Sequence, residues 1–159
     1  MQGNPQIIAT LNALLADELA ARDQYFIHAR MLHNWGLGKL AARLSHEVED
    51  ETGHAKALID RILFLEGTPA MTPSGIKVGR DVPEMLKNDL AVELMVVRNL
   101  RAAIAQCEQE RDYVTREILE PMLDDTEDDH AHWLEQQLGL IDLVGLPNYL
   151  QSQMGGSGS

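Results

Sequence analysis

Apolar positions recur along this 159-residue chain at alternating spacings of three and four residues, the period of an amphipathic α-helix. The first run begins after Asn4 and Pro5, a helix cap followed by a proline at the first helical position, and ends at the break 34–36. A second run covers about 37–65. The pattern therefore predicts two long helices in the first half of the chain.

The second half repeats this arrangement after a long interruption. The segment 66–80 carries three glycines and two prolines, too many for a helix, and it is too long for a tight turn. Helical periodicity resumes at 81–83 and again after 112, where it is expected to end at Gly139, with a kink or bulge at Pro121. A connection of this length can run back along a bundle, which would make the third helix parallel to the second.

Two short segments follow the fourth predicted helix. Residues 146–150 favour a brief fifth helix, and 155–159 resemble an engineered flexible Gly/Ser linker, which we exclude from the fold. Aromatic residues make up only 4% of the chain, which favours helix over sheet. We therefore expect one all-α domain over 1–154, an antiparallel four-helix bundle with a long crossover between helices 2 and 3.

Charge and hydropathy restrict the classes of partner. The formal net charge of -12 argues against a nucleic-acid partner and favours attraction of cations. No run of eighteen apolar residues is present and the polar start lacks the features of a signal peptide, so we expect a cytoplasmic protein without a membrane partner. The single cysteine, Cys107, falls on an apolar stripe and is interpreted as a core thiol.

Polar residues interrupt the apolar stripes at matching places in both halves of the chain. Each half has one glutamate on its first helix and a Glu-x-x-His motif on its second, and the glutamate precedes the motif by 33 residues in one half and by 34 in the other. These six residues are Glu18, Glu51, His54, Glu93, Glu127 and His130. We attribute the longer second spacing to an extra residue accommodated near Pro121, as a π-bulge upstream of the ligands.

The repeat predicts a dinuclear metal site of the kind found in carboxylate four-helix bundles. Four carboxylates buried together would have to be protonated without cations, whereas two divalent cations would neutralise all four. Oxygen ligands with one imidazole per metal and no thiolate suit iron or manganese, with zinc as a competitor. The alternative is that these glutamates lie on solvated faces, which would require a coincidence at six positions.

Longer stretches of the sequence resemble the bacterioferritins. The similarity runs through residues 23–31, 34–37, 61–67, 88–90, 112–114, 133–135 and 148–151. The resemblance implies a ferritin-like bundle that assembles into a 24-subunit shell, with a di-iron ferroxidase centre in each subunit. Such a centre oxidises Fe(II) with O2 or H2O2, and the ferric mineral is stored inside the shell.

The resemblance also implies roles for individual residues. Glu18 and Glu93 would be terminal ligands, Glu51 and Glu127 bridging ligands, and His54 and His130 would each supply one nitrogen. His46 and Asp50 resemble an inner-surface iron site of some family members, although a solvated helix face explains them about as well. Tyr25 resembles a redox-active phenol of some relatives, and packing beside Glu18 is its alternative explanation.

Thr52 departs from the family pattern. Many members have a methionine there, and two such methionines from a subunit pair ligate one haem iron, so we expect homomeric shells of this chain to lack haem. A shell subunit that co-assembles with a haem-binding chain is one alternative. A DNA-protecting mini-ferritin and a di-iron oxidoreductase acting on organic substrates are two others. A ferredoxin is an expected partner for iron release.

Overall fold

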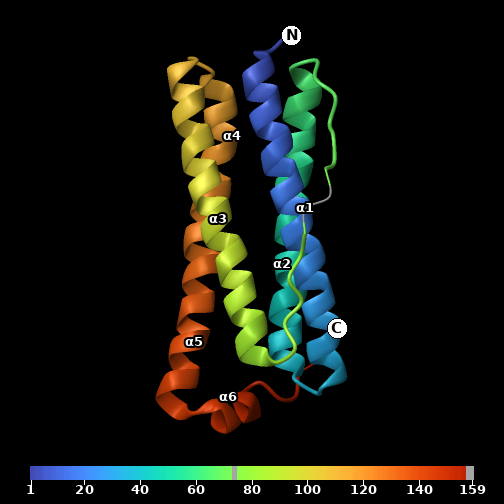
Figure 1. The fold of residues 1–159 in the computed structure, drawn as a ribbon, viewed down its shortest axis with the longest axis vertical. Helices are drawn as coiled ribbons and strands as arrows, with labels where there is room; N and C mark the ends of the chain where they lie inside the picture. Colours follow the sequence, from blue (N-terminus) through green and yellow to red (C-terminus); the bar gives the residue numbers. More distant parts are fainter. Residues whose placement is uncertain (73–74, 157–159) are drawn as a thin grey trace.

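The structure, a computed structural model, describes residues 1–72 and 75–156. In this part of the chain the helical elements form four long rods that pack lengthwise against one another as a bundle (Figure 1). Three rods are single helices and the fourth is continuous through a π-helical segment. The elements are α1 (Pro5–Asn34), α2 (Gly38–Phe64), α3 (Val82–Gln109), α4 (Tyr113–Asp124), the π-helix η1 (Asp125–His132), α5 (Trp133–Val144) and α6 (Leu146–Ser152). The predicted all-α four-helix bundle is confirmed. Of the expected Gly/Ser tail, residues 157–159 lie outside the described part of the chain.

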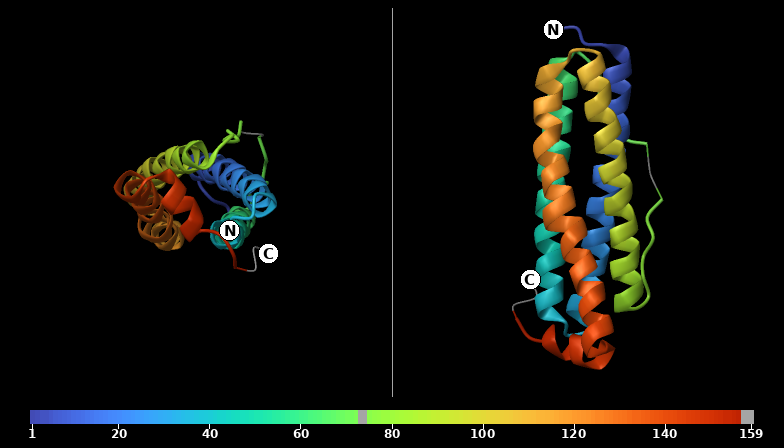
Figure 2. Two further views of the ribbon diagram at one scale, coloured as in Figure 1. Left: turned by 90° about the horizontal axis from the view of Figure 1, so that it is seen from below. Right: turned by 90° about the vertical axis from the view of Figure 1, so that its left-hand side faces the viewer.

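The chain direction along the bundle follows from the long crossover. α1 and α2 run in opposite directions and are joined by a tight turn at Gly36, whose φ of 82° suits glycine. The crossover then returns along the outside of the bundle, so that α3 starts at the same end of the bundle as α2 and runs parallel to it (Figures 1 and 2). The short α6 lies across the end of the bundle at which α5 finishes. The predicted parallel relation of the second and third helices is confirmed.

A buried hydrogen-bond network holds the end of the crossover against the bundle. The Lys77 N–H donates to Gln24 Oε1 at 2.9 Å, and the Gly79 N–H donates to His28 Nε2 at 2.9 Å. Gln24 Nε2 and His28 Nδ1 both contact Asp89 Oδ1, at 2.8 and 3.0 Å. α1, α3 and the crossover are thus joined by side chains that replace the hydration of the loop backbone.

Helix boundaries agree with the sequence except at the end of the fourth rod. Asn4 and Asp81 each accept a hydrogen bond from a backbone N–H of the helix that follows, as expected of N-caps. α5, however, continues through Gly139 to Val144 and ends at Gly145, whose φ is 82°. The prediction of an end at Gly139 was wrong, because an isolated glycine costs a helix only about 1 kcal/mol.

The core divides into two apolar clusters, one at each end of the bundle. One cluster gathers the start of α1, the end of α2, the second half of α3, and α4. The other gathers the end of α1, the start of α2, the first half of α3, α5 and α6. Buried ionisable side chains occupy the level between the two clusters, and this level is where the candidate site lies. Among the described residues, no helix is long and apolar enough to span a membrane.

Candidate metal centre

Five of the six predicted ligands meet at mid-height in the bundle. Glu18 comes from α1, Glu51 and His54 from α2, Glu93 from α3 and His130 from η1, and all five side chains are buried. Each lies on the inward stripe of its helix, where the next apolar residues above and below belong to the two core clusters. The helical period therefore places these five side chains on the inward faces of their helices, at the same height in the bundle.

The five residues form two overlapping groups of potential metal ligands. Glu18, Glu51 and His54 offer ligand atoms within 4.8 Å of one another, and so do Glu51, Glu93 and His130. His54 Nδ1 lies 3.4 Å from Glu18 Oε2, while His130 Nδ1 lies 3.1 Å from Glu51 Oε1. The His54 and His130 rings stack with centroids 6.1 Å apart. Glu51 belongs to both groups, which is the arrangement expected of a carboxylate that bridges two cations.

Crowding of like charges shifts the protonation of the cluster. Burial and the neighbouring Glu18 and Glu93 raise the pKa of Glu51 well above its usual value. Burial also raises the pKa of Glu93, whereas the pKa of Glu18 is lowered because its bonds to Glu51 and His54 outweigh desolvation. Without a cation, the cluster therefore favours protons on Glu51 and Glu93, whereas Glu18 favours its ionised form.

The imidazole of His130 is held in its charged form by the same carboxylates. Burial alone would lower the pKa of His130, but contacts to Glu47, Glu51 and Glu93 raise it far above its usual value. A metal ligand needs an unprotonated nitrogen, so binding of a cation must release protons from this cluster.

Unpartnered ligand atoms show that the residues present fit metal cations. Glu18 Oε1, Glu51 Oε2, Glu93 Oε2 and His130 Nδ1 are buried and have no hydrogen-bond partner. His130 Nδ1 is close to Glu51 Oε1, yet the two atoms are not aligned for a hydrogen bond. Buried acceptors without donors are costly, and a divalent cation satisfies several of them together.

Glu127, the sixth predicted ligand, does not join this cluster. Its side chain is 39% exposed and forms an ion pair with Arg101 of α3. It therefore lies outside both groups, and the expected role of Glu127 as a second bridging ligand does not agree with the structure. Thr126 occupies the inward position instead: it is fully buried and its hydroxyl donates to the Met122 carbonyl at 2.7 Å.

The π-helical register of η1 accounts for the exchange of Glu127 for Thr126. A π-helix turn holds about one residue more than an α-helix turn, because its hydrogen bonds join i to i+5. Residues three apart then diverge, while residues four apart share a face, so Thr126 lies on the buried face with His130. The extra residue inferred from the 34-residue spacing is thus absorbed at Asp125–His132. The prediction of a bulge near Pro121, upstream of the ligands, was wrong in position.

Tyr25 contacts the centre through Glu93. Its hydroxyl donates to Glu93 Oε1 at 2.5 Å, and its ring meets the His130 ring edge-on with centroids 6.5 Å apart. Burial and the nearby Glu93 and Asp89 raise the pKa of Tyr25 well above its usual value, so the phenol remains protonated and can donate. Packing beside the centre is therefore observed for Tyr25, while its redox role stays a prediction.

His46 and Asp50, the predicted inner-surface pair, lie next to the centre on α2. Asp50 Oδ2 is 3.6 Å from His46 Nε2 and 3.2 Å from His130 Nε2. The side chain of His46 is more than half exposed, whereas Asp50 faces inward toward His130. Asp50 is thus grouped with His130 more closely than with His46.

Three acidic residues near the imidazoles were not predicted from the sequence. Glu47 lies 2.5 Å from His130 Nε2, and Asp125 lies 3.1 Å from His54 Nε2. Asp129 is 4.0 Å from His130 Nε2. Glu47 was recognisable as one more acidic residue on the apolar stripe of α2, but the placement of Asp125 and Asp129 depends on the π-helix. Thr52 faces outward on α2, with its hydroxyl donating to the Val48 carbonyl.

An all-α bundle with buried carboxylates and imidazoles at mid-height belongs to the class of dinuclear carboxylate four-helix proteins. A family model described as a ferritin-like domain matches residues 8–144. The chain is 59% identical to a bacterial ferritin of Synechocystis sp., with 97% of this chain and 99% of the relative covered. It is 60% identical to a bacterial ferritin of Pseudomonas aeruginosa, covering 97% and 100%, and 40% identical to a bacterioferritin of Mycobacterium leprae, covering 91% of each. The chain belongs to the ferritin-like family, in its bacterial ferritin and bacterioferritin branch.

Proposed function

We propose that this chain stores iron by oxidising Fe(II) at a dinuclear centre held by five residues. These are Glu18, Glu51, His54, Glu93 and His130. The observation that carries the proposal is the set of buried ligand atoms without hydrogen-bond partners on four of them. The whole constellation lies within one subunit, which argues against a mini-ferritin whose metal site is shared between subunits.

The roles of the five residues follow from their positions. Glu51 is common to both groups and would bridge the two ions, while Glu18 and Glu93 would each serve one side. His54 and His130 would each contribute Nδ1, the nitrogen that faces Glu18 in one case and Glu51 in the other. Fe(II) is the substrate: two ions give up one electron each, and O2 takes up two electrons and two protons to form H2O2, or H2O2 is itself reduced to water.

Because Glu127 lies outside the centre, three carboxylates face the four positive charges of two divalent cations. Two divalent cations are neutralised less completely than in the arrangement predicted from the sequence, in which Glu127 would be a fourth carboxylate. A bridging carboxylate would serve both cations, so both are held more weakly without Glu127. This favours a centre through which iron passes as substrate over one that retains two resident ions.

The working form in this proposal is a 24-subunit homomeric shell that stores ferric mineral in the cytoplasm. Large apolar side chains remain exposed on the isolated subunit, among them Phe26, Leu63, Phe64, Tyr113 and Val114. Exposed apolar residues of this size are typical of subunit contacts. A mixed shell with a haem-binding subunit is the second candidate, favoured by the missing methionine at Thr52, and a ferredoxin is the proposed reductant for iron release.

Two isosteric variants test the proposed centre. Glu51→Gln should lower the initial rate of Fe(II) oxidation at two Fe(II) per subunit by at least about tenfold. Replacing residues that only hydrogen-bond to a metal ligand already commonly lowers activity by about tenfold or more, and Glu51 is a proposed ligand itself. Glu127→Gln is the matched control and should remain within about twofold of the parent, because an exposed ion pair contributes little. Stopped-flow absorbance on assembled shells measures both. Equal rates for parent and Glu51→Gln would refute the site.

A further inference from the structure

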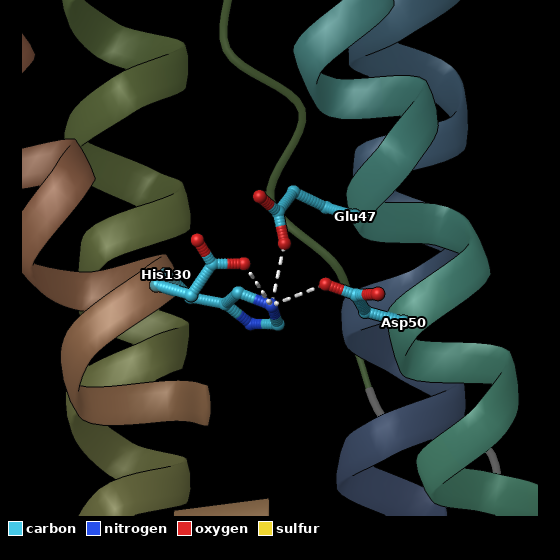
Figure 3. A group of neighbouring side chains, drawn as sticks. Glu47, Asp50 and His130 are labelled. Carbon is cyan, nitrogen blue, oxygen red and sulfur yellow. Dashed lines mark hydrogen bonds and ion pairs between the residues drawn. The ribbon is translucent and has the colours of Figure 1, made fainter. Parts of the chain in front are cut away.

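Each imidazole of the proposed dinuclear centre has a second ring nitrogen, Nε2, which faces away from the centre. His130 Nε2 lies 3.2 Å from Asp50 Oδ2, and Figure 3 shows Glu47 and Asp50 of α2 pointing toward the His130 ring. His54 Nε2, on α2, lies 3.1 Å from Asp125 Oδ2, which comes from the start of η1. The support is therefore reciprocal: carboxylates of α2 contact the imidazole of η1, and a carboxylate of η1 contacts the imidazole of α2.

The contact with Asp125 determines which nitrogen of His54 is free to bind a cation. It is the shorter of the two hydrogen-bond contacts of this ring, since Nδ1 lies 3.4 Å from Glu18 Oε2. In a neutral imidazole one nitrogen donates a hydrogen bond and the other accepts. When Nε2–H donates to Asp125, Nδ1 keeps its lone pair on the side of Glu18 and Glu51. The geometry thus favours the tautomer that a metal ligand requires.

The backbone of η1, and not burial, sets the position of Asp125. Its side chain is 56% exposed, whereas the side chain of His54 is only 10% exposed. Asp125 is the first residue of η1 and directly precedes the buried Thr126, so it lies at the edge of the inward face, toward α2. Within residues 1–72 and 75–156, no second hydrogen bond or ion pair engages its carboxylate. Substitution of Asp125 therefore removes one contact and leaves both apolar clusters intact.

We propose that Asp125 is a positioning residue of the centre, which acts through His54 to strengthen cation binding by the Glu18–Glu51–His54 group. A carboxylate behind a metal-binding histidine fixes the orientation of the ring and raises its basicity as a ligand. The inference rests on the ligand role of His54 in the proposed function. Through Asp125 the fourth rod supports this group, even though Glu127 of the same rod lies outside it.

Co(II) binding to assembled apo-protein under argon tests the role of Asp125 without turnover. Visible absorbance follows the titration, and anomalous scattering at the cobalt edge from soaked crystals locates each ion. Asp125→Ala should weaken binding at the Glu18–Glu51–His54 group by about tenfold or more. Asp125→Asn keeps a hydrogen-bond acceptor without the charge and should lie between Asp125→Ala and the parent. Asp128→Asn is the matched control and should bind like the parent, because Asp128 is an exposed acid of the same π-helix outside the groups of potential ligands.

A double-mutant cycle with His54 separates positioning from a general effect of negative charge near the centre. His54→Ala alone should weaken Co(II) binding, and adding Asp125→Ala to it should cause no further loss, because the carboxylate acts through the ring. The inference is overturned if Asp125→Ala binds Co(II) like the parent, or if it causes the same loss in the parent and in His54→Ala. The proposed function fails separately, if His54→Ala itself binds Co(II) as tightly as the parent.

Discussion

Glu93 illustrates how a single buried carboxylate is supported at the centre. One oxygen accepts the short hydrogen bond from Tyr25, and the other has no partner. Tyr25 is thus the donor that keeps Glu93 facing the cluster when no cation is bound. In its packing role the Tyr25 hydroxyl only donates a hydrogen bond to Glu93, whereas the predicted redox role requires the phenol to be oxidised.

Replacing Tyr25 with phenylalanine separates these roles. Tyr25→Phe should lower the free energy of unfolding of the apo-subunit by about 1–3 kcal/mol, because the Glu93 carboxylate loses its donor while the ring still packs. Denaturant unfolding of apo-protein measures the change. The redox role additionally predicts an organic radical in freeze-quenched EPR spectra of the parent after O2 addition, absent from the phenylalanine variant. A radical of equal intensity in both proteins would exclude Tyr25 as its source.

Four of the five predicted ligands that meet at the centre lie on ordinary α-helix, and the fifth, His130, is buried within the π-helix. Glu18, Glu51, His54 and Glu93 follow from apolar stripes that continue unbroken on either side of them. Glu127 did not follow, because Glu-x-x-His reports a shared face only in α-geometry. The outward position of Glu127 depends on where the π-helix lies. The pattern of apolar and polar side chains does not reveal that position.

At the scale of elements, the fourth rod is where sequence and structure diverge most. Helix starts were predictable because Asn4 and Asp81 are caps with a local mechanism. The π-helix was inferred but misplaced, because Pro121 is the strongest breaker in the sequence and yet α4 continues past it to Asp124. The crossover was recognised from its glycines and prolines, whereas its attachment through Gln24, His28 and Asp89 requires contacts distant in sequence.

Deleting one residue before the π-helix should restore the α-helical register. Asp124 is exposed, and its removal brings Glu127 to the position four residues after Met122, where Thr126 now lies buried. We expect the variant lacking Asp124 to have a continuous α-helix there, with Glu127 beside Glu51, and to bind the second Fe(II) more tightly. A crystal structure and an anaerobic Fe(II) titration measure these outcomes. A persistent π-helix, or unchanged affinity with Glu127 inside, would contradict the prediction.

On the scale of the whole molecule, a charged layer separates the two apolar clusters, so stability depends on what neutralises that layer. The pKa values of Glu51, Glu93 and His130 are raised in the folded protein. Groups with raised pKa values stabilise the fold below their unfolded pKa and lose that contribution as pH rises through the folded value. The lowered pKa of Glu18 acts only at more acidic pH and does not offset this effect near neutrality.

Apo-protein should therefore be less stable at about pH 8 than at about pH 6.5. Zn(II), used as a redox-inert probe, should raise the melting temperature, and by more at the higher pH, since binding releases protons. Differential scanning calorimetry of chelator-treated and Zn(II)-loaded shells measures both effects. A metal-dependent increase that shrinks as pH rises would show that these groups do not bind the cation.

Haem content is also a property of the assembled molecule, because the family's haem is ligated by residues from two subunits. Thr52 is exposed on α2, where its hydroxyl is already bonded to Val48. We expect purified homomeric shells to show no haem Soret band, and Thr52→Met shells produced with ample haem to acquire one. Haem in shells of the parent chain alone would refute this expectation.

The confinement of the π-helix to Asp125–His132 has a consequence for how such a protein can change. The π-helical register places a hydroxyl rather than a carboxylate at the buried position, while both flanking helices pack against the two apolar clusters. We therefore expect a change of one residue in the length of this segment to alter iron binding while the two flanking helices keep their packing. Subunits that differ in chemistry would remain interchangeable parts of one shell.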